Sequence, residues 1–135
     1  MASTLLAVNG VLVDSDVLIW FARGNLQAIA ALNTLTDSYI SAVSYMELVQ
    51  GCRNKAELKV LQRAFKSNRH DVLPVTHEIS DLAIELVEQY ALSHSLYLAD
   101  ALIAATALSH DLVLLSANDK HFSAIKGLKL RVFRA

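Results

Sequence analysis

The sequence predicts an α/β fold: a three-layer α/β/α domain around a central, mainly parallel sheet of about five strands. Two observations support this fold class. Short apolar runs alternate with amphipathic segments from one end of the chain to the other, which is the pattern of parallel strands joined by crossover helices. The chain has 135 residues, 54% of them hydrophobic, enough to bury a core without disulfides or metals. We therefore expect a single domain over residues 1–135.

Apolar runs and turn residues indicate where each element lies. The expected strands are residues 11–13, 39–41, 72–75, 112–115 and 130–133. The expected helices are residues 17–22, 26–35, 44–51, 54–69, 76–90 and 99–108. Asn25 and Thr76 are N-cap residue types, and Gly24 and Gly51 end the helices before them. The helix over 99–108 is rich in small residues, so we expect it to pack closely against the sheet.

Composition limits the cellular setting and the partners. Cys52 is the only cysteine, so no disulfide within the chain is possible, and a reducing, cytoplasmic setting is expected. The amino terminus does not resemble a secretory signal, and no uncharged stretch approaches the ~20 apolar residues of a membrane-spanning helix. The net charge of −1 argues against a strong general affinity for nucleic acid.

One helix has a strongly basic face. In the segment 54–69, apolar residues recur every three or four positions and basic residues occupy the opposite side. The basic residues are Lys55, Lys59, Arg63 and Lys66. Such a face is most often solvated surface, and the alternative is contact with the phosphates of RNA.

Four acidic positions are expected to meet at one edge of the sheet. Asp14 and Asp119 each follow a strand, and the carboxyl ends of parallel strands lie at the same edge. Glu47 and Asp100 lie in the first turns of their helices and can point toward that edge. Like charges ~4 Å apart repel by roughly 4 kcal/mol at an effective dielectric constant near 20, so such a cluster favours a bound cation. Oxygen ligands select Mg²⁺ or Mn²⁺, which can activate water for hydrolysis of a phosphodiester.

Most of these acids also have a structural interpretation. Ser44 and Glu47 match the capping-box pattern, in which the glutamate bonds to the backbone. Asp100 can simply interact with the helix dipole, although it lies in the most apolar helix of the chain. Asp16 is expected to cap the helix that follows it. Asp14 has no evident structural role, because it ends a buried strand.

Other catalytic patterns are not found in the sequence. No serine lies in a nucleophile elbow, and there is no glycine-rich phosphate loop. His121 has no evident partner for a catalytic triad. Metal-assisted chemistry is the interpretation that remains.

Four motifs in a fixed order carry a resemblance to a known family. They are DSDVLI at 14–19, SAVSYMELVQG at 41–51, LADALIAATA at 98–107 and LLSANDKHF at 114–122. In this order and at these separations, they resemble the motifs of the PIN-domain nucleases, and among those the VapC-like toxins of bacterial type II toxin–antitoxin modules. The resemblance implies a PIN-like fold and a Mg²⁺- or Mn²⁺-dependent endoribonuclease.

The resemblance also implies which residues act. Asp14, Glu47 and Asp100 match the acids of the family, and Asp14 and Asp100 are its surest metal ligands. The supporting positions are Ser15, Asp16, Ser116 and Asn118.

The turn after the fourth strand departs from the family pattern. Ser116 stands where a threonine is common, and His121 stands before Phe122, where an acid is common. Either Asp119 or Asn118 would then fill the fourth active-site position.

The resemblance implies partners as well. The expected partners are an RNA substrate, a second copy in a homodimer, and a small VapB-like antitoxin whose tail lies across the active-site groove. A basic side chain of the antitoxin could occupy the acidic pocket. Operator DNA would be bound only through the antitoxin.

The sequence also allows other functions. An apolar strand before Asp14-Ser15-Asp16 is similar to the nucleophile motif of haloacid-dehalogenase-type phosphatases, which form an aspartyl-phosphate. That family, like the phospho-receiver domains, needs a downstream lysine that is not evident here. A noncatalytic PIN-fold binding module would have no need for mutually repelling carboxylates. The nuclease is therefore the preferred interpretation.

Overall fold

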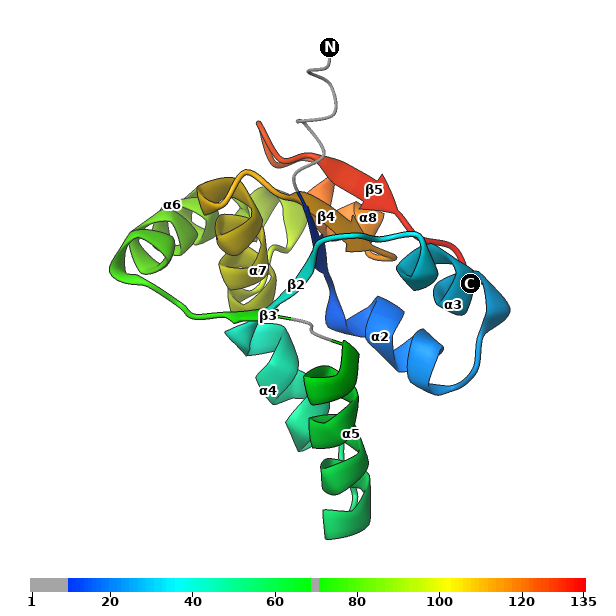
Figure 1. Ribbon diagram of the computed structural model, residues 1–135. Helices are drawn as coiled ribbons and strands as arrows, with labels where there is room; N and C mark the ends of the chain where they lie inside the picture. The colour runs from blue at the N-terminus through cyan, green and yellow to red at the C-terminus, as the bar shows by residue number, and fades with distance from the viewer. Residues whose placement is uncertain (1–9, 69–70) are drawn as a thin grey trace.

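The computed structural model describes residues 10–68 and 71–135, and over this part of the chain it contains a five-stranded sheet (Figure 1). The strands are β1 (Val11–Val13), β2 (Ser38–Ser41), β3 (Asp71–Leu73), β4 (Val113–Ser116) and β5 (Leu130–Val132). They lie in the order β3-β2-β1-β4-β5, and each neighbouring pair is parallel. The predicted α/β class with a parallel sheet is confirmed.

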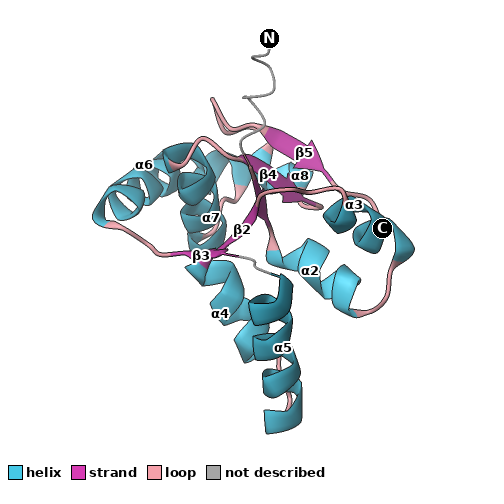
Figure 2. Ribbon diagram, in the orientation of Figure 1, coloured by secondary structure: helices cyan, strands magenta, loops and turns pink. Residues whose placement is uncertain are grey.

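Helices form the connections between the strands (Figure 2). They are α2 (Ser15–Ala22), α3 (Leu26–Asn33), α4 (Ala42–Gln50), α5 (Lys55–Asn68), α6 (His77–His94), α7 (Leu98–Ser109) and the short α8 (Asp119–Phe122). In Figure 1, α6 and α7 lie on one side of the sheet and α2 and α3 lie on the other, while α4 and α5 extend away from it. None of the helices in the described ranges is long and apolar enough to cross a membrane.

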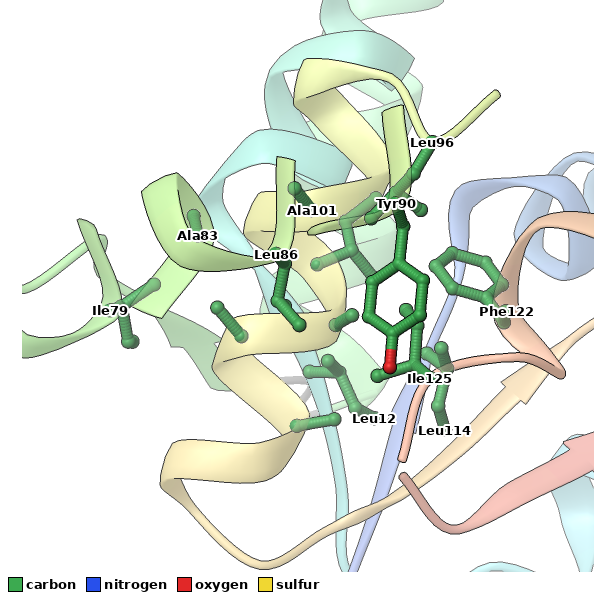
Figure 3. Close-up of a cluster of buried hydrophobic side chains, with 14 of the residues drawn as sticks. Leu12, Ile79, Ala83, Leu86, Tyr90, Leu96, Ala101, Leu114, Phe122 and Ile125 are labelled. Carbon is green, nitrogen blue, oxygen red and sulfur yellow. The ribbon is translucent and has the colours of Figure 1, made fainter. Parts of the chain in front are cut away.

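The buried side chains form two clusters, one on each face of the sheet. Alternate residues of a strand point to opposite faces. Leu12 accordingly packs in the cluster formed with α6 and α7, which Figure 3 shows, whereas Val11 and Val13 pack in the cluster formed with α2 and α3. These two cores produce the predicted three-layer arrangement.

Helix α7 packs tightly in the interior, as its small residues predict. The side chains of Ala101, Ala104, Ala105 and Ala107 are all fully buried. Because alanine lets a helix approach its neighbours closely, α7 can lie between α6 and the sheet. This close packing holds the first turn of α7 near the carboxyl ends of the strands.

Helix α2 begins two residues earlier than predicted. Asp14 is its N-cap, and Asp14 Oδ1 accepts a hydrogen bond from the backbone N–H of Ser15 at 2.8 Å. The prediction that Asp16 caps this helix is therefore wrong, because Asp16 already lies in the first helical turn. The acid that ends the strand also begins the helix.

Helix α4 also begins two residues earlier than predicted. Ser41 is its N-cap, and its hydroxyl oxygen accepts a hydrogen bond from the backbone N–H of Ser44 at 3.0 Å. The capping-box interpretation of Ser44 and Glu47 is therefore wrong, since Glu47 lies in the second turn and cannot bond back to the cap. Glu47 is left available for another role.

The remaining differences are small. The predicted N-caps Asn25 and Thr76 are confirmed by hydrogen bonds from their side chains to backbone N–H groups. Strand and helix ends coincide with the predicted positions or differ from them by up to four residues. Helix α8 was not predicted, because a single turn has no hydrophobic period to detect.

Candidate active site

The carboxyl ends of β1 and β4 form the point where the order of the sheet reverses. From β1 the chain adds β2 and β3 on one side, and it then returns to add β4 and β5 on the other side. In open α/β sheets, ligands bind outside the carboxyl ends of the strands at such a point. Asp14 follows β1 here, and its backbone N–H donates to the carbonyl oxygen of Leu115 in β4 at 2.9 Å.

A buried serine at the end of β4 holds the carboxylates that follow β1. The hydroxyl of Ser116 donates to Asp14 Oδ2 at 2.7 Å and lies 3.4 Å from Asp16 Oδ2. The same hydroxyl oxygen accepts from the backbone N–H of Asn118 at 3.0 Å. Asp16 Oδ2 also accepts from the backbone N–H of Ala117 at 3.0 Å. The turn after β4 therefore fixes the positions of both carboxylates.

Two helices bring further acids to the same place. The Ser15 hydroxyl in α2 donates to Glu47 Oε1 of α4 at 3.2 Å. In the first turn of α7, Asp100 Oδ2 accepts from the backbone N–H of Tyr97 at 3.4 Å, so Asp100 does have a capping contact. Its negative charge also acts on Asp16. The structure thus brings together four acids, here called the acidic cluster: Asp14, Asp16, Glu47 and Asp100.

Burial and repulsion raise the pKa values of two acids of the cluster, Asp14 and Asp16. The pKa of Asp14 is raised to about 7, mainly by burial and next by the negative charge of Asp16, with a smaller contribution from Glu47. The hydrogen bonds that Asp14 accepts oppose this rise. Burial also raises the pKa of Asp16, and the charge of Asp100 adds to the effect. Without a cation, the ionised cluster is unfavourable.

The cluster has the chemical properties of a cation site. Among the described residues, no lysine or arginine forms an ion pair with Asp14, Asp16 or Glu47. Asp16 Oδ1 is buried and has no hydrogen-bond partner. In the part of the chain that the structure describes, no group of three or more aspartate, glutamate, histidine or cysteine side chains is placed so that it could hold a metal ion. Mg²⁺ usually keeps several waters and takes one or two carboxylates plus substrate phosphate, so these residues fit a hydrated divalent ion.

The structure adds His121, which the sequence left without a partner. His121 Nδ1 lies 3.0 Å from Asp100 Oδ2 and 3.1 Å from Asn118 Nδ2. The ring also meets Tyr97 edge-on, with 5.7 Å between ring centroids. The sequence offered no partner with which His121 could build a catalytic triad, and its two partners here, Asp100 and Asn118, include no serine or cysteine nucleophile. The contact depends on α8 and on a separation of 21 residues from Asp100, neither of which a local pattern reports.

The basic face of α5 lies on the outside of the molecule. Lys59, Arg63 and Lys66 are exposed, and with Gln62 they line an open hollow on the surface. The fourth predicted residue, Lys55, is also exposed, on the first turn of the helix. The opposite side of α5 packs on α4, where the rings of Phe65 and Tyr45 are 5.2 Å apart in an edge-to-face arrangement. The amphipathic pattern therefore has its expected orientation.

Comparison with known proteins identifies the family. Residues 11–128 match the PIN domain. The chain belongs to the PIN-domain family.

Several relatives of this PIN domain are similar over most of their length. Ribonuclease VapC10 from Mycobacterium tuberculosis is 40% identical over 126 residues, which cover 88% of this chain and 90% of that protein. A toxin–antitoxin complex from Klebsiella pneumoniae contains a chain with 28% identity and a TM-score of 0.75, with 87% of this chain and 94% of that chain covered. FitAcB from Neisseria gonorrhoeae has 26% identity and a TM-score of 0.69, with 92% and 96% covered.

The turn after β4 in this PIN domain separates the two candidates for the fourth active-site position. Asp119 forms an ion pair with Arg134 at 3.2 Å, and its side chain is 43% exposed. Asn118 contacts His121, which in turn contacts Asp100. The neutral amide is thus the candidate that is linked by contacts to the acidic cluster.

Proposed function

We propose that this protein is the toxin of a type II toxin–antitoxin module and acts as a Mg²⁺- or Mn²⁺-dependent endoribonuclease. The observation that carries the proposal is an acidic cluster built around the buried Asp14, in which no described lysine or arginine pairs with Asp14, Asp16 or Glu47. The chain that holds this cluster is 40% identical to Ribonuclease VapC10. The cluster lies at the crevice where an α/β sheet binds its ligands. Hydrolysis of RNA phosphodiester bonds is the reaction that this combination supports.

Several residues at the site are proposed to hold the metal ion. Asp14, Asp100 and Glu47 are the proposed catalytic acids and metal ligands, and Asn118 is the proposed neutral group at the fourth position. A divalent ion bound there supplies Lewis-acid polarisation of the phosphate and activation of water. Ser116 keeps Asp14 in place through its 2.7 Å hydrogen bond, which leaves Asp14 Oδ1 and Oδ2 little freedom to move.

The phosphatase alternative lacks a required group. An aspartyl-phosphate intermediate at Asp14 would call for a lysine nearby, and no lysine forms an ion pair with Asp14 in the described ranges of the chain. The serine hydroxyl that Asp14 accepts from and the acids around it suit a cation instead. Metal-assisted hydrolysis is therefore the function we favour.

An antitoxin and a second copy of the chain are proposed as protein partners. The support for the antitoxin is the 28% identical chain from Klebsiella pneumoniae, whose structure is a toxin–antitoxin complex. A basic side chain of the antitoxin would be attracted to the acidic cluster, where it would take the place of the metal charge. Operator DNA would then be bound through the antitoxin, since this chain has a net charge of −1.

Removal of divalent metal is expected to stop RNA cleavage by the purified protein. The carboxylates alone would repel the phosphate of the substrate, so activity should require Mg²⁺ or Mn²⁺ and should return when either ion is added after EDTA treatment. Cleavage of a labelled RNA measured with and without EDTA tests this. Cleavage that persists in excess EDTA would refute the mechanism, and hydrolysis of a phosphate monoester without RNA cleavage would favour the phosphatase.

The basic face of α5 is proposed to hold RNA phosphates. The double variant Lys59→Gln, Arg63→Gln is expected to weaken RNA binding several-fold and to reduce the salt slope by about one to two, because each lost phosphate contact lowers the number of released counterions. Binding to a labelled RNA at several salt concentrations measures both quantities.

A control variant removes the same charge from the end of the sheet at which the parallel strands begin, opposite the end that carries the acidic cluster. In Lys126→Gln, Lys129→Gln the two lost cations lie just before β5. This variant is expected to keep the salt slope of the wild-type protein. If the α5 variant behaves in the same way as this control, then the α5 face is ordinary solvated surface.

A further inference from the structure

One ring nitrogen of His121 faces two groups with opposite requirements. Nδ1 is 3.0 Å from Asp100 Oδ2, which is an acceptor, and 3.1 Å from the amide nitrogen of Asn118, which is a donor. A protonated Nδ1 can donate to Asp100 but has no lone pair for the amide. An unprotonated Nδ1 can accept from the amide, and its lone pair then faces a carboxylate. With this amide orientation, either state leaves one contact unsatisfied.

A cation between Nδ1 and Asp100 would satisfy both groups. Two ligands that are about 2.1 Å from a six-coordinate ion and at right angles to each other lie about 3.0 Å apart, and the observed separation of Nδ1 and Oδ2 is 3.0 Å. Ligand histidine must be unprotonated, so its lone pair and the carboxylate would both face the positive charge. The present spacing therefore needs little rearrangement to accept an ion.

The surroundings hold the imidazole in place. The side chain of His121 is 27% exposed and that of Asp100 is 16% exposed. The ring of Tyr97 packs edge-on against the imidazole at an interplanar angle of 85°, and the neighbouring Phe122 is fully buried and anchors α8 in the core. A side chain fixed on a short helix beside the acidic cluster is suitable as a ligand.

We propose that His121 supplies a nitrogen ligand beside Asp100 and thereby makes the metal site of this protein prefer Mn²⁺ to Mg²⁺. The inference rests on the proposed metal site of the acidic cluster. Mg²⁺ is held by oxygen ligands and keeps several waters, whereas Mn²⁺ accepts oxygen ligands and, as a first-row transition ion, also gains affinity from an imidazole nitrogen. Replacing a hard oxygen ligand with nitrogen therefore shifts the preference away from Mg²⁺.

The test is electron spin-echo spectroscopy of Mn²⁺ bound to the full-length, tag-free protein, which detects nitrogen coordinated directly to the ion. The wild-type protein is expected to show nitrogen coupling, and His121→Ala and His121→Asp are expected to lose it. In parallel titrations with MnCl₂ and MgCl₂, His121→Asp is expected to lower the ratio of Mn²⁺ affinity to Mg²⁺ affinity by about tenfold or more, because it restores an oxygen ligand. If the alanine variant fails to fold, His121→Asp still tests the role of the imidazole nitrogen.

A second histidine–aspartate pair in the chain serves as a control, because it is exposed and lies away from the acidic cluster. His77 and Asp81 lie 3.3 Å apart on α6, but their side chains are 93% and 61% exposed. His77→Ala is expected to keep the nitrogen coupling and the affinity ratio of the wild-type protein, and loss of the coupling in this variant would overturn the assignment to His121.

The outcomes separate this inference from the proposed function. Mn²⁺ that binds in an Asp14-dependent manner without nitrogen coupling would overturn the role of His121 and leave the acidic site intact. An unchanged affinity ratio in His121→Asp would overturn it too. Failure of Mn²⁺ to bind at all would overturn both proposals.

Discussion

Asp14→Asn is expected to reduce RNA cleavage by about 1,000-fold or more while the protein stays folded. A bound metal contributes several kcal/mol of transition-state stabilisation, and each 1.4 kcal/mol is a factor of ten in rate. Asparagine has nearly the same shape as aspartate, so its oxygen can still accept from the N–H of Ser15. The variant therefore removes the charge that would hold the metal and keeps the cap of α2.

Initial rates on a labelled RNA, together with circular dichroism, measure this effect. Asp111→Asn is the matched control, because Asp111 forms an exposed ion pair with Lys129 and has a positive φ of 52°, which asparagine also tolerates. The control is expected to keep the wild-type rate within about twofold. In bacteria, expression of the wild-type chain alone is expected to arrest growth, and Asp14→Asn should relieve the arrest. Wild-type cleavage rates in a folded Asp14→Asn protein would contradict the role of Asp14.

The metal-free protein is expected to lose stability as the pH rises from about 4 to about 7. The pKa of Asp14 is about 7 in the folded protein and 3.8 for a free aspartate. Over this interval the unfolded chain releases its proton before the folded chain does, so the free energy of unfolding falls with increasing pH. Each pKa unit corresponds to about 1.4 kcal/mol, which predicts a loss of up to about 4 kcal/mol that levels off above pH 7.

Urea unfolding in EDTA across this pH range isolates the contribution of Asp14. Other carboxylates also titrate, so the informative quantity is the difference between the wild-type protein and Asp14→Asn. Asp14→Asn is expected to be more stable than the wild-type protein near pH 8 and of similar stability near pH 4. Divalent metal should stabilise the wild-type protein at pH 8, since it offsets the repulsion in the acidic cluster. A constant difference at all pH values would show that the burial of the charge has no energetic cost.

Most of the architecture was predictable from local patterns. Hydrophobic period, turn residues and alternating apolar runs placed every strand and all of the longer helices, because these signals reflect which side of each element is buried. The sequence also predicted where three of the acids lie. Asp14 follows a strand, and Glu47 and Asp100 lie in neighbouring helices, so all three are expected near the edge of the sheet where the parallel strands have their carboxyl ends.

The caps of α2 and α4 were less predictable than those of α3 and α6, since two residues competed for each. Asp14 and Asp16 both have side chains that can cap α2, and the hydrogen bond from the Asp14 N–H to Leu115 in β4 fixes where the strand ends. Asp16 is then drawn to the backbone N–H of Ala117. The choice of the residue that caps α2 therefore depends on contacts with residues about 100 positions away in the chain.

The sequence by itself determined the fold class, the apolar and basic faces of the helices, and the acids that end the strands, because each depends on residues close together in the chain. Only the tertiary structure decided that Ser116 holds Asp14, that Asp119 pairs with Arg134, and that His121 meets Asp100. These contacts join residues between 15 and 102 positions apart. Their partners are chosen by the packing of the sheet and of α8, which no local pattern encodes.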